Sequence, residues 1–245
     1  MKYYQQFLVE FQECLYKGET MEDIVFKEFE GIKYIQFKRL LDLGITHCYT
    51  LKSEGIDFTR GNLNENQSYE KICKALEISK ESLLIPKQTH TDIVRCVNFD
   101  TKEKDLIDTD GLITDKKDIT LVSKNADCIL FLFYDPIKKV IANIHSGWRG
   151  TFKKIAEKAV LKMINNYDCR AEDILCFINP SIRKCHFEVD SDVKELCEEI
   201  FEFTKKTEEF ILLGEIKEGK TLNQLIKAVA DIRIKGRKYS RLRFM

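Results

Sequence analysis

The segment IHSGWRG, residues 144–150, separates an apolar run from an amphipathic segment. It holds the only tryptophan of the chain and two of its eleven glycines, Gly147 and Gly150. Glycine adopts backbone angles that a side chain would forbid, so the chain can turn sharply here as it leaves a strand. Loops that a rigid scaffold holds in this way often carry the chemistry of a protein. We therefore expect His145 and Arg149 to lie on one exposed rim.

The residues before this segment predict an antiparallel hairpin. Residues 129–134, ILFLFY, form a continuous apolar run, which is typical of a strand buried on both faces. Residues 140–144, VIANI, form the return strand, and the connection over 135–139 begins with the turn-forming pair Asp-Pro. An antiparallel pair brings the end of its second strand back to the start of the first. Cys128 and His145 should therefore lie side by side.

The remaining apolar patterns predict helices that cover a mixed or antiparallel sheet. The strongest helical periodicity runs over 151–164, and a turn at Thr109-Asp110-Gly111 precedes a short apolar strand. Weaker patterns predict helices over 33–43, over 68–76 with Ser68 as the cap, and from 190 and 221, and strands over 45–51, 119–123 and 173–178. No internal repeat or linker divides the chain. The prediction is a single α/β (α+β) domain over residues 1–245.

Composition narrows the class of protein. The chain has 245 residues, of which 44% are hydrophobic, enough for one large core. Its 40 basic and 40 acidic residues cancel, so no net field attracts nucleic acid or an anionic membrane. No apolar run approaches the roughly 20 residues of a membrane helix, and the first residues lack the features of a secretory signal. The nine irregularly spaced cysteines are expected to be reduced thiols, which indicates a cytoplasmic protein.

His90, Cys128 and His145 are the candidate metal ligands. One soft thiolate with two imidazoles suits zinc and also copper. Three protein ligands would leave a fourth position open to water or substrate, as in a catalytic site. The predicted hairpin brings Cys128 and His145 together, whereas no local pattern places His90 beside them. The alternative is two polar histidines in turns and a buried cysteine.

The same atoms fit a second chemistry, in which Cys128 attacks an acyl or amide carbon and His145 acts as its base. Arg149 fits a phosphate or carboxylate through its planar guanidinium, or else forms a surface ion pair. Asp110 and Asp127 fit general bases, or groups that orient a histidine. The alternative for the two aspartates is a structural role, as a turn former and as the cap of a helix or strand.

Four motifs occur in an order that resembles a known family. They are Gln88-Thr89-His90, Ala126-Asp127-Cys128, HSGWRG at 145–150, and Asn179-Pro180-Ser181-Ile182 with Phe187-Glu188-Val189. Over residues 40–235 they together resemble the YfiH-like family, also called the laccase-domain or multicopper polyphenol oxidase family. Each motif alone is weak, whereas the four in order are specific. Members of this family are regarded as multifunctional purine nucleoside phosphorylases.

This resemblance implies a four-layer α-β-β-α sandwich, similar to the catalytic domain of cytotoxic necrotizing factor. It implies a zinc site, with copper as the other candidate metal, whose ligands match His90, Cys128 and His145. It also implies phosphorolysis of adenosine, inosine and S-methyl-5'-thioadenosine, with adenosine deamination as a further activity. The expected partners are a nucleoside and phosphate, with no nucleic acid or membrane, and the expected state is a monomer or homodimer.

The expected site residues complete this prediction. Cys128, His145, Arg149 and Asp127 are the expected catalytic residues, and Arg149, Lys52, Arg60 and Gln88 are expected to bind substrate. Lys52 stands where the family usually has an arginine, and it keeps the charge without the planar fork. Asn179-Pro180 replaces the family's Gly-Pro. Residues 235–245 differ from the C-terminal segment of many members, so the substrate pocket is expected to close differently.

Three other functions stay open. The first is a copper-dependent phenol oxidase, which the family's older name suggests, although one site with a cysteine and two histidines matches poorly the several coppers that oxygen reduction usually requires. The second is a metal-free hydrolase of cell-wall precursors that uses Cys128 and His145. The third is a non-enzymatic binding protein. The metal content of the purified protein separates these hypotheses.

Overall fold

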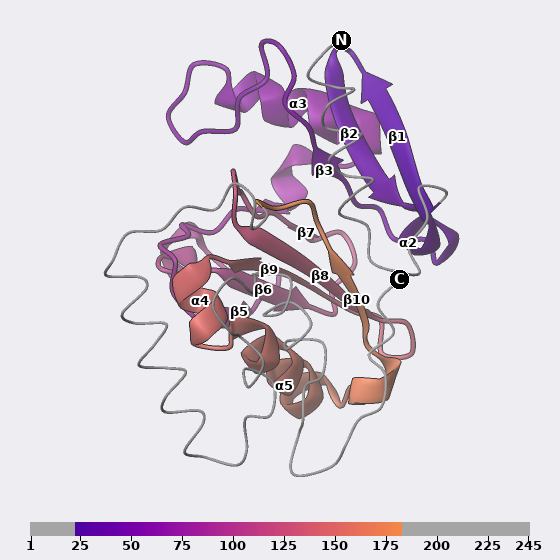
Figure 1. Ribbon diagram of the computed structural model, residues 1–245, viewed down its shortest axis with the longest axis vertical. Helices are drawn as coiled ribbons and strands as arrows, with labels where there is room; N and C mark the ends of the chain where they lie inside the picture. Colours follow the sequence, from indigo (N-terminus) through magenta and orange to yellow (C-terminus); the bar gives the residue numbers. More distant parts are fainter. Residues whose placement is uncertain (1–22, 183–245) are drawn as a thin grey trace, which may run out of the picture. The chain divides into compact units, whose positions relative to one another are not determined.

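The computed structural model describes residues 23–182 of the 245-residue chain. These residues belong to two compact units, one over 23–84 and the other over 85–182 (Figure 1). The helices predicted from residues 190 and 221 lie outside the described residues. A single domain over 1–245 therefore stays a prediction.

The first unit is built on an antiparallel hairpin of β1 (Ile24–Phe29) and β2 (Ile32–Phe37), with β3 (Tyr49–Thr50) on the other side of β2. Glu30 and Gly31 connect the two long strands with φ angles of 45° and 83°. Two successive positive φ angles give the tight turn whose twist matches that of its strands. The described part is completed by α2 (Lys38–Asp42), α3 (Glu65–Leu76), a 3₁₀ turn (Lys80–Ser82) and β4 (Leu83–Leu84).

Two helix predictions in the first unit need correction. The helix predicted over 33–43 is wrong in its first half, which forms β2, and only α2 is helical. Its apolar residues fit both a helical and an extended pattern, and pairing with β1 decides for the strand. The helix predicted to start at Ser68 begins at Glu65. Ser68 is buried within it, and its Oγ accepts a hydrogen bond from the Asp57 amide at 2.9 Å.

The second unit contains a five-stranded sheet in the order β10-β8-β9-β6-β5. Its strands are β5 (Val94–Cys96), β6 (Gly111–Thr114), β8 (Ile129–Asp135), β9 (Val140–Ser146) and β10 (Leu175–Ile178), and the short β7 (Thr120–Leu121) lies outside this sheet. β5 and β6 are parallel, and the other neighbours are antiparallel. The prediction of a mixed α/β fold is confirmed. The four-layer sandwich and the likeness to cytotoxic necrotizing factor stay predictions.

The predicted hairpin is present as β8 and β9. Leu130 is opposite His145 in this pair, and Ile129 is opposite Ser146. Asp135 closes the turn at the far end, because its Oδ1 accepts hydrogen bonds from the amides of Ile137 and Lys138 at 2.8 and 2.9 Å. The register therefore brings the residue that precedes β8, Cys128, to the end of the hairpin where β9 carries His145.

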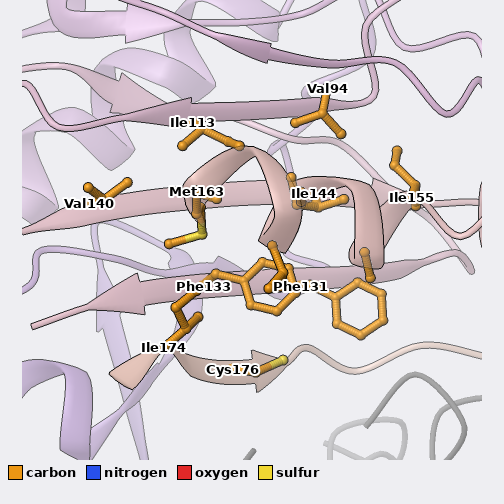
Figure 2. Packing of buried hydrophobic residues seen from close by; sticks show 14 of the residues in the cluster. Val94, Ile113, Phe131, Phe133, Val140, Ile144, Ile155, Met163, Ile174 and Cys176 are labelled. Atoms are coloured by element: carbon orange, nitrogen blue, oxygen red, sulfur yellow. The ribbon is translucent and has the colours of Figure 1, made fainter. Parts of the chain in front are cut away.

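One face of this sheet is covered by α4 (Trp148–Phe152) and α5 (Ile155–Tyr167) (Figure 1). The single helix predicted over 151–164 is broken at Lys154, which has a left-handed φ of 60°. The break lets α5 place its buried residues, including Ile155 and Met163, on the apolar face of β6, β8 and β9 (Figure 2). None of the helices within residues 23–182 is long and apolar enough to cross a membrane.

Candidate metal centre

Three side chains from separate segments of the second unit converge at one end of the β8–β9 hairpin. They are His90, which precedes β5, Cys128, which precedes β8, and His145 near the end of β9. One ligand atom from each lies within 4.8 Å of the other two. The Sγ of Cys128 is 3.8 Å from Nε2 of His90, and the two imidazole rings are 5.0 Å apart at 81°. The structure thus brings all three predicted ligands together.

His145 is buried, with 2% of its surface exposed, so the prediction that it lies with Arg149 on an exposed rim is wrong for this residue. Its Nδ1 lies 2.7 Å from Oδ1 of Asp110. Because the carboxylate can only accept here, Nδ1 carries the proton that faces Asp110, and Nε2 is the atom that would bind a metal once it has lost its own proton. Burial alone would lower the pKa of His145. The hydrogen bond to Asp110, together with the neighbouring Cys128, outweighs burial and raises the pKa to about 9.

Asp110 joins the segments that carry His90 and His145, although the predicted site residues did not include it. The carboxylate is fully buried and accepts backbone hydrogen bonds from the amides of Thr89, His90 and Thr91 at 3.3, 3.1 and 2.8 Å. The Thr91 hydroxyl donates a side-chain hydrogen bond to Asp110 Oδ2 at 2.7 Å. Burial raises the pKa of Asp110, but the hydrogen bonds from His145, Thr91 and Thr89 outweigh it and lower the pKa to about 2. Asp110 therefore orients a histidine, one of its two predicted roles.

The sequence indicates Asp110 as part of a turn before a strand, but it does not reveal the contacts that Asp110 makes with His145 and residues 89–91. The Thr109-Asp110-Gly111 turn precedes β6, and β6 pairs with β9, which carries His145. Backbone pairing continues past the strand, since the His145 amide donates to the Asp110 carbonyl at 2.7 Å. Asp110 could therefore have been predicted to orient His145 from its place at the start of β6, the strand that pairs with β9.

His90 has a left-handed backbone, with φ of 61°, which is uncommon for a residue with a side chain. The hydrogen bond from its amide to Asp110 Oδ1 helps to hold it in this conformation. Burial lowers the pKa of His90, and the nearby His145 and Arg149 lower it further, whereas Asp110 opposes them. His90 is therefore held as a neutral imidazole, the form that binds a metal.

The two glycines of the 144–150 segment serve close packing, which corrects the prediction that they permit unusual backbone angles. Gly147 has an ordinary φ of −64°. A Cβ atom at Gly147 would lie 2.5 Å from Cδ2 of His90, and one at Gly150 would lie 2.9 Å from the carbonyl oxygen of Thr91. Both positions therefore require glycine because the segment that bears His90 packs against them.

Cys128 ends a loop that several hydrogen bonds hold. The Nδ2 of Asn125 donates to the carbonyl of Cys128 at 2.6 Å. The carbonyl of Asp127 accepts a hydrogen bond from the Ile182 amide at 2.9 Å. Asp127 itself is exposed beside Cys128. The structure therefore places this predicted catalytic residue next to a candidate ligand on the surface of the second unit.

The other predicted site residues lie in three different places. Arg149 is exposed on α4, and its guanidinium carbon lies 4.1 Å from the centre of the Trp148 ring. Gln88 forms hydrogen bonds to the backbone of the loop that precedes Cys128. Lys52 and Arg60 belong to the first unit. Their roles in substrate binding stay predictions.

The donor set fits a metal ion. A thiolate and two imidazoles are ligands that zinc and copper both accept. Bonds of about 2.3 Å to sulfur and 2.0 Å to nitrogen would place two tetrahedral ligand atoms roughly 3.5 Å apart. The observed 3.8 Å between Cys128 Sγ and His90 Nε2 is close to this value. Asp110 supplies the carboxylate that commonly fixes a ligating histidine.

Residues 59–233 match the sequence family described as multi-copper polyphenol oxidoreductase laccase. This match covers more than half of the chain, and the protein belongs to that family. The family predicted from the four motifs is therefore confirmed. The matched range includes the three candidate ligands, Asp110 and Arg149.

Two proteins similar to this chain are both named purine nucleoside phosphorylase. A protein of Clostridium acetobutylicum named purine nucleoside phosphorylase is 31% identical over 162 residues, which are 66% of this chain and 65% of that protein. The mouse purine nucleoside phosphorylase LACC1 is 41% identical over 78 residues, 32% of this chain and 18% of that protein. The chain thus spans less than two thirds of the length of either relative.

The fold has solved counterparts. The crystal structure of the Bacillus licheniformis hypothetical protein YfiH matches with a TM-score of 0.66 and 21% identity, and the match covers 83% of this chain and 84% of that one. At this identity the likeness concerns the fold alone. It agrees with the mixed α/β arrangement and several sheets seen in the described residues.

Proposed function

We propose that this protein is a metal-dependent purine nucleoside phosphorylase. The proposed metal is zinc, and the proposed substrates are phosphate with adenosine, inosine or S-methyl-5'-thioadenosine. Adenosine deamination is a proposed further activity. The observation that carries the proposal is the convergence of His90, Cys128 and His145 beside Asp110. The choice of purine nucleosides rests on the names of the similar proteins.

Phosphorolysis replaces one bond of the nucleoside. The glycosidic bond between the sugar carbon and the purine nitrogen breaks with its electron pair going to the purine, which then takes a proton. A phosphate oxygen forms the new bond to the same carbon, through an oxocarbenium-like state. The protein must therefore bind the phosphate anion and relieve the charge that develops on the leaving purine.

The proposed roles follow from the chemistry of each side chain. His90, Cys128 and His145 would hold the metal, which when bound supplies a Lewis acid to the site. Arg149 is exposed over the Trp148 ring, and its planar fork would bind the phosphate. Asp127, exposed beside Cys128, is the proposed acid–base group. Cys128 and His145 are proposed catalytic residues as well as metal ligands. Lys52, Arg60 and Gln88 are the remaining proposed substrate contacts.

Copper-dependent phenol oxidation is the second candidate function, because the family description names it. Residues 23–182 contain one group of three potential ligands, which is enough for one metal ion. This gives phenol oxidation little support, because oxygen reduction usually involves several coppers. The metal-free hydrolase and the binding protein predict no bound metal. Zinc and copper contents of the protein purified without added metal, measured beside Cys128→Ala, distinguish these functions.

The direct test is product analysis. Incubated with adenosine and phosphate, the protein is expected to release adenine and ribose 1-phosphate, with inosine or hypoxanthine from deamination. His145→Ala is the control for a contaminating phosphorylase. Release of adenine that needs His145 but not phosphate would overturn the proposal and favour hydrolysis. Release that needs neither would come from a contaminating enzyme and would favour the binding protein. A cytoplasmic location and a monomeric or dimeric state complete the proposal.

A further inference from the structure

Both polar atoms of the Gln88 side chain bind the backbone of one distant residue. Its Nε2 donates to the carbonyl of Lys124 at 2.8 Å, and its Oε1 accepts from the Lys124 amide at 2.7 Å. The two residues are 36 positions apart in the sequence. The carboxamide thus pairs with Lys124 as a peptide group of a neighbouring strand would.

The two partners lie on the segments that carry two of the candidate ligands. Gln88 precedes His90 by two residues, and Lys124 precedes Cys128 by four. The side chain therefore joins these two segments directly. The same stretch, 88–91, also donates three backbone hydrogen bonds to Asp110, which orients His145.

We propose that Gln88 is a positioning residue, which fixes the Cys128 loop against the His90 segment and so sets the spacing of the two ligands. This inference rests on the metal site of the proposed function. A substrate contact by Gln88 would have to displace hydrogen bonds that both ends of the carboxamide already make, whereas the positioning role uses these bonds as they stand.

The chemistry at position 88 is specific to glutamine. Glutamate would keep an acceptor for the Lys124 amide but would place a carboxylate oxygen against the Lys124 carbonyl, where no hydrogen is available. Methionine has a similar length and offers neither a strong donor nor a strong acceptor. Both substitutions keep the approximate volume of the side chain, so their effects report the loss of the paired hydrogen bonds.

The experiment is a titration of the metal-free protein with Co²⁺, without nucleoside, in wild type, Gln88→Met and Gln88→Glu. The spectrum reports affinity and also the thiolate-to-cobalt absorption that depends on Cys128. Gln36→Met is the matched control, since Gln36 is buried and its Nε2 donates to the His47 carbonyl at 2.6 Å, in the first unit.

Both Gln88 variants are expected to bind Co²⁺ about 10- to 100-fold more weakly, as is usual when a group that supports a ligand is lost. Their thiolate absorption should weaken, while Gln36→Met keeps the wild-type affinity and spectrum. Should Gln88→Met not fold, Gln88→Glu carries the test. Wild-type cobalt affinity in a folded Gln88 variant overturns the inference and leaves the metal site standing. Failure of the wild type to bind cobalt overturns both.

Discussion

The backbone of Gly147 lies directly against the imidazole of His90. A Cβ atom at position 147 would come within 2.5 Å of His90 Cδ2, closer than two carbon atoms can approach without a shift. His90 is also held through its amide, which donates to Asp110 Oδ1 at 3.1 Å. The position of this candidate ligand therefore depends on the absence of a side chain in the segment that carries His145.

Gly147→Ala is expected to weaken metal binding with little loss of secondary structure. The added methyl group must displace the His90 ring, and the site should lose at least about tenfold in Co²⁺ affinity. Gly44→Ala is the matched control. Gly44 has φ of 75°, and an added Cβ atom would have no neighbour within 4 Å, so alanine there costs roughly 1 to 2 kcal/mol of stability and should leave metal affinity unchanged. Equal cobalt affinities in wild type and Gly147→Ala would contradict this account.

Asp110→Asn is expected to lower both stability and metal affinity. The Oδ2 of Asp110 accepts from the Thr89 and Thr91 amides and the Thr91 hydroxyl, so an amide group there would face donors. Each donor left unsatisfied costs about 1 to 3 kcal/mol. With His145 less firmly oriented, Co²⁺ affinity should fall about 10- to 100-fold. Urea unfolding and cobalt titration measure the two effects.

The control for Asp110→Asn is Asp135→Asn. Asp135 is equally buried, and it accepts backbone hydrogen bonds in the turn at the other end of the β8–β9 hairpin. Asparagine can keep both bonds through its Oδ1, so this variant should keep its cobalt affinity. If both aspartate variants bind cobalt as the wild type does, Asp110 has a structural role only.

The sequence was sufficient to predict the neighbourhood of Cys128 and His145. A buried apolar strand, a short turn and a return strand leave one antiparallel pairing, and its register then follows from the turn. His90 could not be placed in the same way. Its segment is held by Asp110, Gly147 and the side chain of Gln88, contacts between residues far apart in the sequence that no local pattern reveals.

Two element predictions went wrong where one apolar pattern admits two structures. Residues 33–37 are apolar at positions that suit a helix, and only pairing with β1 makes them a strand. The helical periodicity over 151–164 continues through the break between α4 and α5. Lys154 has a left-handed φ angle there, and a lysine gives no sequence indication of such a break. Such features depend on tertiary packing.

Arg149→Lys is expected to keep the metal and lose phosphorolysis. The guanidinium is exposed above the Trp148 ring and is not a metal ligand, since a cation cannot ligate zinc. Lysine keeps the charge and loses the planar fork that suits phosphate. The catalytic constant should fall roughly 100-fold. Arg170→Lys, which changes a surface arginine paired with Glu172, is the control and should be fully active. Loss of metal from Arg149→Lys would contradict the proposed role.

His47 is expected to make the first unit less stable in mild acid. Its Nε2 accepts a hydrogen bond from the Phe37 amide at 2.8 Å, and its Nδ1 donates to the carbonyl of Ile45 at 2.9 Å. A proton on Nε2 would face the Phe37 amide and break the first bond. Burial lowers the pKa of His47, and Lys27 adds to this, although the hydrogen bond to Ile45 opposes them. The folded protein therefore prefers the neutral ring.

The sign of the pH dependence follows from proton uptake on unfolding. The unfolded chain binds a proton at His47 near pH 6.5, whereas the folded chain resists it, so stability is fully present above about pH 6.5 and is lost as the pH falls towards the lowered pKa. One proton changes the free energy of unfolding by at most about 1.4 kcal/mol per pH unit.

Urea unfolding of wild type and His47→Gln between pH 8 and 5, followed by circular dichroism, isolates this contribution, because the other histidines and the carboxylates titrate in both proteins. The wild type should lose more stability than His47→Gln below about pH 6.5. Parallel curves would show that the His47 ring is protonated as readily in the folded chain as in the unfolded one.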